Sequence, residues 1–119
     1  MDVRLKRAYE APAASDGYRV LVDRLWPRGV KRQDARLDEW ARELAPSAEL
    51  RRWFGHDPDR FERFRLRYTA ELAAQEKKLR ELRRRAREGR LTLVYAAHDS
   101  EHNDAVVLAE ILRSGGRAR

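Results

Sequence analysis

Three polar side chains that could bind a ligand and transfer protons follow the most apolar stretch of the chain. Residues 91–97 form a nearly unbroken apolar run. Asp99, His102 and Asn103 come directly after it. Because histidine can act as an acid or base near neutral pH and a carboxylate can orient its ring, Asp99 and His102 are candidate catalytic residues, with Asn103 as a candidate binding residue. The structural alternative is that these side chains cap the following helix and satisfy loop backbone groups.

A second group of candidate binding residues lies at the end of an earlier stretch rich in β-branched residues. Residues 18–26 end with Arg24 and Trp26, and Arg28 follows in the next loop. Trp26 and Pro27 stiffen the path between the two arginines. Two guanidinium groups beside a rigid turn could clamp a carboxylate or a phosphate. The alternative is that Arg24 forms a structural salt bridge with Asp23 or another acidic residue.

The two groups can meet only if the segments before them are neighbouring strands. Residues 18–26 and 91–97 both have the composition of strands, and the segment between them is helical. A long helical crossover joins parallel strands, whose carboxyl ends lie at the same edge of the sheet. In α/β proteins ligands bind at that edge. The predicted function is therefore to bind a small phosphate- or carboxylate-bearing anion, with acid–base chemistry left open.

The whole chain, residues 1–119, is expected to form a single α/β domain. Alternation of apolar and charged residues around Val3 and Leu5 predicts a short strand. With the two strands above, it completes a small, mainly parallel, three-stranded sheet flanked by helices. Residues 114–119 are expected to be a loose C-terminal tail.

Three shorter helices are predicted around this sheet. Apolar residues at helical spacing predict a helix over residues 34–45. Ser47 is a good N-cap for a short helix that Gly55 ends. The final helix is expected to begin near Ser100 and to be apolar nearly all round, which favours burial against the sheet.

One long amphipathic helix is expected between Asp57 and Gly89, just before the last strand. Asp57 followed by proline is a typical helix start, and Gly89 provides a C-cap. Its apolar stripe is interrupted only at Gln75. At about 30 residues the helix would be roughly 45 Å long. Its C-terminal half would then project or pack on a second subunit, so a homodimeric interaction protein is one alternative function.

The same helix carries the excess of positive charge. The formal net charge of the chain is +7, and residues 60–90, with 12 Lys/Arg and 5 Asp/Glu, account for it. A second alternative function is therefore sequence-neutral binding to nucleic-acid phosphates. The candidate contacts are Arg80, Arg83, Arg84 and Arg87.

Several classes of protein are excluded or disfavoured. The chain has no cysteine, so it has no disulfide, zinc–thiolate site or thiol nucleophile. It lacks a histidine pair at metal-ligating spacing, a glycine-rich nucleotide loop and a nucleophile elbow, so we predict no metal and no cofactor. No apolar run reaches the roughly 20 residues that a membrane helix needs, and no secretory signal is evident, which favours a cytoplasmic protein. These patterns leave open whether the protein is an enzyme.

Four short motifs resemble the YeaO-like branch of the bacterial domain-of-unknown-function family 488. They span nearly the whole chain in the order of that family. The motifs are residues 23–29 (Asp-Arg-Leu-Trp-Pro-Arg-Gly), 44–47 (Leu-Ala-Pro-Ser), 53–57 (Trp-Phe-Gly-His-Asp), and 95–97 (Tyr-Ala-Ala) with Asp99, His102 and Asn103. The resemblance implies a compact α/β domain and no particular activity. The resemblance implies that members of the broader family have cysteines near the second and last motifs. This chain has no cysteine, so any thiol chemistry of those relatives does not apply to it.

Overall fold

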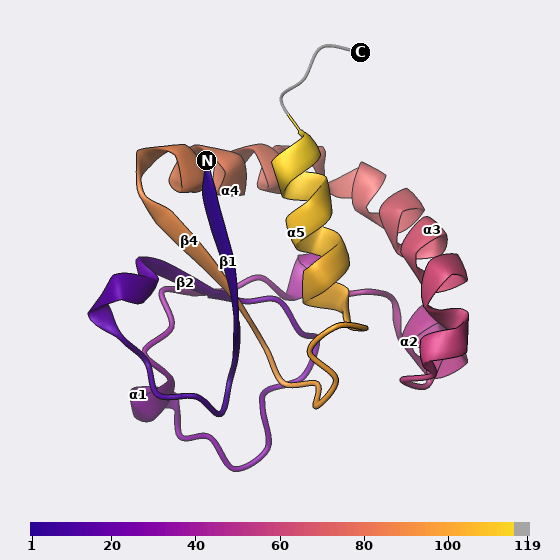
Figure 1. Ribbon diagram of the computed structural model, residues 1–119, viewed down its shortest axis with the longest axis horizontal. Coiled ribbons are helices and arrows are strands. Elements are labelled where there is room, and N and C mark those ends of the chain that lie inside the picture. The colour runs from indigo at the N-terminus through magenta and orange to yellow at the C-terminus, as the bar shows by residue number, and fades with distance from the viewer. Residues whose placement is uncertain (116–119) are drawn as a thin grey trace.

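The computed structural model describes residues 1–115 as a four-stranded, all-parallel sheet with helices packed against it (Figure 1). The strands, in the spatial order β1-β4-β2-β3, are β1 (Asp2–Arg7), β4 (Arg90–Tyr95), β2 (Tyr18–Leu21) and β3 (Glu39–Trp40). The α-helices are α1 (Arg32–Ala35), α2 (Ala48–Phe54), α3 (Phe61–Leu72), α4 (Glu76–Glu88) and α5 (Asp104–Ser114). The α/β class with a parallel sheet is confirmed, but the predicted number of three strands is wrong because β3 was not foreseen.

The two strands that precede the candidate site are parallel neighbours, as their composition predicted. Tyr18 of β2 lies opposite Leu91 of β4, and Leu21 lies opposite Val94. Both strands therefore run toward the same edge of the sheet. The loops that leave that edge contain both groups of candidate residues.

Strand β2 ends earlier than the predicted boundary at Trp26. The amide of Val22 still donates to the carbonyl of Val94 at 3.1 Å, which continues the ladder. At the next residue a side chain replaces the backbone as the partner of β4: Oδ2 of Asp23 accepts the amide of Ala96 at 2.8 Å. This contact fixes the carboxylate of Asp23 at the end of β4.

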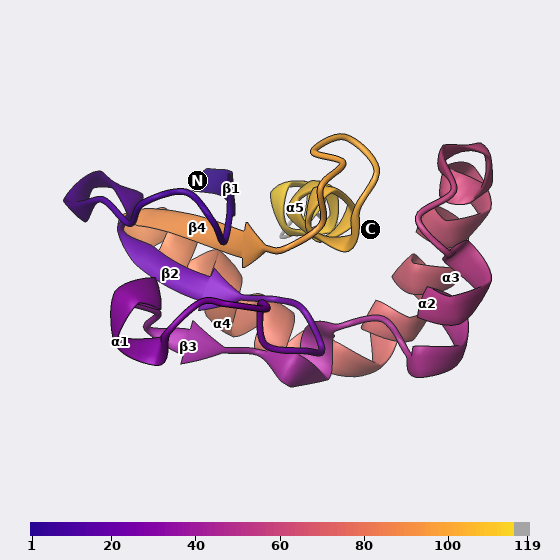
Figure 2. The ribbon, with the colours of Figure 1, turned by 90° about the horizontal axis from the view of Figure 1, so that it is seen from below.

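The hydrophobic core lies between one face of the sheet and helices α3, α4 and α5 (Figure 2). Val3, Val20 and Leu93 lie on this face, where Leu79 of α4 and Leu108 of α5 join them in one buried cluster. Since alternate side chains of a strand point to opposite faces, the residues between them lie on the other side of the sheet. A buried polar network is built there.

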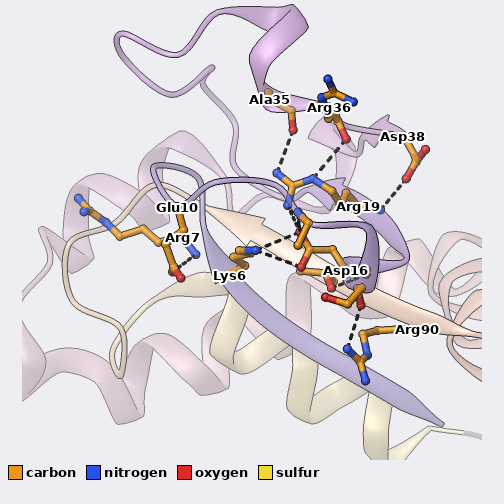
Figure 3. A network of polar contacts seen from close by, with 12 residues as sticks. Lys6, Arg7, Glu10, Asp16, Arg19, Ala35, Arg36, Asp38 and Arg90 are labelled. Carbon is orange, nitrogen blue, oxygen red and sulfur yellow. Dashed lines mark hydrogen bonds and ion pairs between the residues drawn. The ribbon is translucent and has the colours of Figure 1, made fainter.

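Arg19 of β2 is the centre of this network, and its side chain is almost fully buried (Figure 3). Its guanidinium donates to the carboxylate of Asp16 at 2.6 Å and to the carbonyls of Ala35 and Arg36 at 2.9 and 3.2 Å. Its own amide donates to the carboxylate of Asp38 at 2.8 Å. One arginine thus ties β2 to the segments before and after it.

This network explains why the predicted helix over residues 34–45 is wrong. Helix α1 ends after one turn because Arg36 adopts a left-handed conformation (φ 48°, ψ 46°). The carbonyls at the end of that turn accept from Arg19 rather than from later amides of a longer helix. The chain then pairs with β2, with Glu39 opposite Val20, and forms β3. Helical spacing was present in the sequence, but a long-range polar contact decided the outcome.

The long helix predicted between Asp57 and Gly89 is two helices. A 3-10 turn, Ala73–Gln75, separates α3 from α4, and Gln75 leaves the helical region (φ −114°, ψ 31°). After this turn α4 runs in a different direction (Figure 1). Helix α3 packs on α2 and α5, whereas α4 packs on β4, β1 and α5. The apolar stripe of α4 is therefore covered by its own chain, and the prediction that this half projects is wrong.

The helix ends that depend on local signals agree with the sequence. The hydroxyl of Ser47 accepts the amide of Leu50 at 3.1 Å, which caps α2, and Gly55 ends that helix at φ 54°. Asp57 caps the short turn before α3. Ser114 still belongs to α5, so the predicted tail does not begin there, and residues 116–119 lie outside the described residues.

Among residues 1–115, no helix is both long enough and apolar enough to cross a membrane.

Candidate functional site

A cavity of about 600 Å³ opens at the carboxyl edge of the sheet. Its wall comes from the loop after β1, the segment after β2, helix α2, and the segment between β4 and α5. Five of the six cavity-site residues predicted from the sequence line it. They are Arg24, Trp26, Arg28, Asp99 and Asn103. His102, the sixth, is not among the residues that line the cavity in the described part of the chain.

Three arginines line the cavity without forming ion pairs inside the described chain. Arg24 and Arg28 are exposed at the rim, and Arg51 comes from α2. Within residues 1–115, no carboxylate lies within 4.0 Å of their guanidinium nitrogens. The Nε of Arg51 is buried and has no hydrogen-bond partner among the described residues. The salt bridge considered for Arg24 is therefore not formed there.

Trp26 is held as a fixed part of the cavity wall. Its indole N–H donates to the carbonyl of Val30 at 2.6 Å, which closes the loop after β2. Its ring meets Trp40 edge-on at 5.4 Å between centroids, and the guanidinium of Arg32 lies 4.5 Å from its ring centroid. The tight turn needs Gly29 at φ 82°, a conformation that favours glycine. These contacts position the arginines on either side of Trp26.

Asp99 and His102 interact as predicted, but their contacts organise a loop. Nδ1 of His102 lies 2.9 Å from Oδ2 of Asp99, and its ring meets Phe61 edge-on. The other carboxylate oxygen of Asp99 accepts the amides of Glu101 and His102 at 2.9 and 3.0 Å. The amide of Glu101, followed by the imidazole of His102, holds the pKa of Asp99 below its ordinary value. Because His102 is turned against Phe61, it does not face the cavity with Asp99.

Asn103 is the N-cap of α5, so the predicted helix start near Ser100 is four residues too early. The side-chain oxygen of Asn103 accepts the amide of Val106 at 3.0 Å, and its NH₂ group donates to the carbonyl of Asp99 at 2.8 Å. The turn made by Asp99 occupies the preceding amides and delays the helix. Although Asn103 lines the cavity, both ends of its buried amide group are used by the backbone.

Two acidic side chains that line the cavity were not among the site residues predicted from the sequence. Asp23, at the end of β2, and Asp104, the first residue of α5, are hydrogen-bonded to each other through their side chains. Two carboxyl groups can form such a hydrogen bond only when one of them is protonated. Burial, followed by the charge of Asp23, raises the pKa of Asp104 well above its ordinary value. Burial also raises the pKa of Asp23, while Arg51 and His56 act in the opposite direction.

This pair predicts a stability difference that depends on pH. The pKa of Asp104 is higher in the folded state than in the unfolded state. The stability of the wild-type protein should therefore fall as the pH rises from the ordinary pKa of Asp through the pKa of the folded state, where Asp104 ionises. Asp104→Asn keeps a hydrogen-bond donor and cannot ionise. We expect its melting temperature, relative to wild type, to be higher at pH 8 than at pH 4.5. Asp34→Asn, at an exposed position, is the control, and an equal difference at both pH values would contradict the assignment.

The basic residues of α4 divide into exposed and buried ones. Arg80, Arg84 and Arg87 are exposed. Arg83 is buried, with 6% of its surface exposed, and its guanidinium donates to the carbonyls of Ile111 and Leu112 and to Glu76. The guanidinium of Arg83 is therefore engaged inside the fold, unlike those of the three exposed arginines. Binding of nucleic acid by the other three stays a prediction, as does a homodimer.

A protein-family model matches nearly the whole chain. The model, described as the inactive DUF488-N3 subclade, matches residues 2–117. The chain belongs to this subclade of the DUF488 family. Among residues 1–115, no group of three or more His, Asp and Glu side chains of this DUF488-N3 protein is arranged to hold a metal ion.

Relatives of this DUF488-N3 protein cover nearly its full length. It is 47% identical over 114 residues to the uncharacterized protein YeaO of Escherichia coli (strain K12). The alignment covers 96% of this chain and 99% of the relative. It is 43% identical over 110 residues to the uncharacterized protein Rv3073c of Mycobacterium tuberculosis (strain ATCC 25618 / H37Rv), with 92% of each chain covered. No solved structure matches it. The resemblance to the YeaO-like branch is thus confirmed.

Proposed function

We propose that this DUF488-N3 protein binds a small phosphate- or carboxylate-bearing anion in the cavity and does not convert it. The observation that carries the proposal is the set of three guanidinium groups on one cavity, without ion pairs inside residues 1–115. Arg24 and Arg28 at the rim, with Arg51 behind them, offer the donors that phosphate and carboxylate groups bind. The position at the carboxyl edge of a parallel sheet supports the same proposal.

The acidic residues of the cavity do not cancel this positive charge. The carboxylate of Asp99 accepts two backbone amides and contacts His102. Burial raises the pKa of both Asp23 and Asp104, which favours a protonated carboxyl group in this pair and lowers its negative charge. Three arginines therefore face a smaller negative charge, and an anion entering the cavity meets net attraction.

Binding without conversion is favoured over acid–base catalysis by the placement of His102. A general base must come within hydrogen-bond reach of the proton that it removes. His102 is held by Asp99 and packs against Phe61 beside the cavity instead of lining it. The description of the subclade as inactive agrees with a binding role.

A titration with inorganic phosphate tests the proposal. In amide NMR spectra at pH 7, we expect shifts concentrated on residues 23–28, 51–56 and 96–104. Arg24→Ala should weaken binding by at least about tenfold, since charge-assisted hydrogen bonds typically contribute about 1.5–3 kcal/mol. Its melting temperature should stay near that of wild type, because Arg24 is exposed and makes no ion pair within residues 1–115.

Arg63→Ala is the matched control, because Arg63 is exposed on α3 and does not line the cavity. It should bind phosphate as wild type does. Shifts scattered over the surface, or equal losses in both variants, would show non-specific attraction to a basic protein. A large loss of stability in Arg24→Ala would show that this arginine is structural.

A further inference from the structure

We propose, building on the proposed function, that the ligand is a nucleoside monophosphate whose phosphate lies on Arg24 and Arg28 and whose base edge meets the Asp23–Asp104 carboxyl pair. The sequence reading assigned no role in binding to this pair. It adds to the cavity a second polar centre that differs in chemistry from the arginines. The two centres together restrict the class of ligand.

The size of the cavity argues against a bare anion. A volume of about 600 Å³ lies within the usual range of small-molecule sites, roughly 300–1,000 Å³. It corresponds to about twenty water molecules at the volume that each occupies in the liquid, roughly 30 Å³. Inorganic phosphate or acetate would leave most of this space to water. An organic group attached to the anion is needed to fill it.

The walls of the cavity favour a flat ring as that organic group. Aromatic and apolar side chains supply much of the lining, including Tyr9, Trp26 and Pro46, and the buried rings of Phe54 and Phe64 form the base behind them. Such surfaces bind the faces of aromatic ligands through burial of apolar area and stacking. A sugar alone, with hydroxyl groups on every side, would leave these faces poorly matched.

The carboxyl pair and Arg51 then provide donors and acceptors side by side. Asp23 accepts the amide of Ala96 and Asp104 accepts the amide of Ala105, and each carboxyl group keeps further oxygen lone pairs that can accept hydrogen bonds. The buried Nε of Arg51 is a donor without a partner in residues 1–115. The edge of a nucleobase carries N–H donors beside oxygen or nitrogen acceptors, and Asp accepts from exocyclic amino groups. An aliphatic chain would leave these groups unsatisfied, which costs free energy.

The arginines and the carboxyl pair differ in exposure, and this difference determines how the ligand would be oriented in the cavity. Arg24 and Arg28 are exposed at the rim, whereas Asp23 and Asp104 are partly buried. A charged phosphate can keep part of its hydration at the rim, while the base enters the sheltered part. The groups that face the carboxyl pair there are Arg51 and His56, and Tyr68 is buried close to both carboxyl groups.

Calorimetric titration with a small panel tests this inference. The probes are AMP, GMP, CMP, UMP, ribose 5-phosphate and inorganic phosphate. We expect at least one nucleoside monophosphate to bind at least tenfold more tightly than both ribose 5-phosphate and inorganic phosphate. Asp104→Asn should reduce this preference at least tenfold while leaving the binding of inorganic phosphate unchanged.

Two further variants make the result specific. Asp34→Asn makes the same chemical change at an exposed position and should bind as wild type. If Asp104→Asn does not fold by circular dichroism, Asp23→Asn replaces it and should also reduce the preference for the nucleotide. Unchanged preference in the folded variant would overturn the role of the pair.

The panel also separates failure of this inference from failure of the proposed function. If all six probes bind alike and Arg24→Ala weakens them all, the anion site stands and the nucleotide assignment is overturned. The same holds if ribose 5-phosphate binds as tightly as the best nucleotide. If none of the probes binds, the nucleotide assignment fails together with the phosphate form of the proposed function.

Discussion

Arg19→Met should lower the free energy of unfolding by about 3–5 kcal/mol, which is the usual cost of removing one partner from a buried ion pair. The side chain of Arg19 is 5% exposed and that of Asp16 is 10% exposed, so water cannot replace the lost contact. The substitution also leaves the carbonyls of Ala35 and Arg36 without their guanidinium donor. Urea denaturation followed by circular dichroism measures the loss. A typical domain has a free energy of unfolding of about 5–15 kcal/mol, so the expected loss is a large fraction of the total stability.

Arg4→Met is the matched control in the neighbouring region of the sheet. Arg4 pairs with Asp2 at 2.8 Å, but its side chain is 58% exposed, so the change should cost less than about 1 kcal/mol. In Arg19→Met the carboxylate of Asp16 keeps Lys6 as a partner, 3.1 Å from both oxygens, so most of the loss comes from the two carbonyls left without a donor. Equal losses for Arg19→Met and Arg4→Met would show that the buried network does not stabilise the fold.

Phe64→Ala should have a comparable effect, about 3–5 kcal/mol, because it removes a phenyl ring from the core. Phe64 of α3 is 1% exposed and stacks on Phe54 at 4.4 Å between ring centroids. It also packs against Phe61 and Tyr68. The ring fills the space between the core and the cavity, so its loss leaves a void that the neighbouring elements cannot close completely. Thermal and urea unfolding monitor this loss.

Leu66→Ala provides the control on the same helix. Leu66 is 71% exposed, so its truncation should change stability by less than about 0.5 kcal/mol. Phe64→Leu should fall between the two because it keeps part of the volume. If Phe64→Ala unfolds at the same urea concentration as wild type, the stacking of Phe64 on Phe54 does not stabilise the packing between α2 and α3.

The order of the segments could be read from the sequence because local rules govern it. An apolar run bounded by a glycine and a polar cluster specified β4, and a helical crossover required β2 to be parallel to it. The caps at Ser47 and Asp57 depend on neighbours only a few residues away. The convergence of Arg24 and Arg28 with Asp99 on one cavity followed from that topology alone.

The incorrect predictions concern segments where contacts with residues distant in the sequence override the local preference for a helix. The spacing over residues 34–45 suits a helix, but Arg19 holds the end of α1 and β2 offers an edge to pair with. The stripe between Asp57 and Gly89 also suits one helix. Gln75 interrupts it, and the two halves then pack on different elements. Periodicity alone does not specify which surface each half will cover.

The sequence by itself determined the α/β class, the parallel pairing of the two strands before the site, and the edge at which the candidate residues gather. Only the tertiary structure placed His102 against Phe61, buried Arg83, and joined the carboxyl groups of Asp23 and Asp104. The physical reason is the range of the interactions. Strand composition and caps act over a few residues, whereas burial and hydrogen bonding between side chains at opposite ends of the chain depend on how the elements pack.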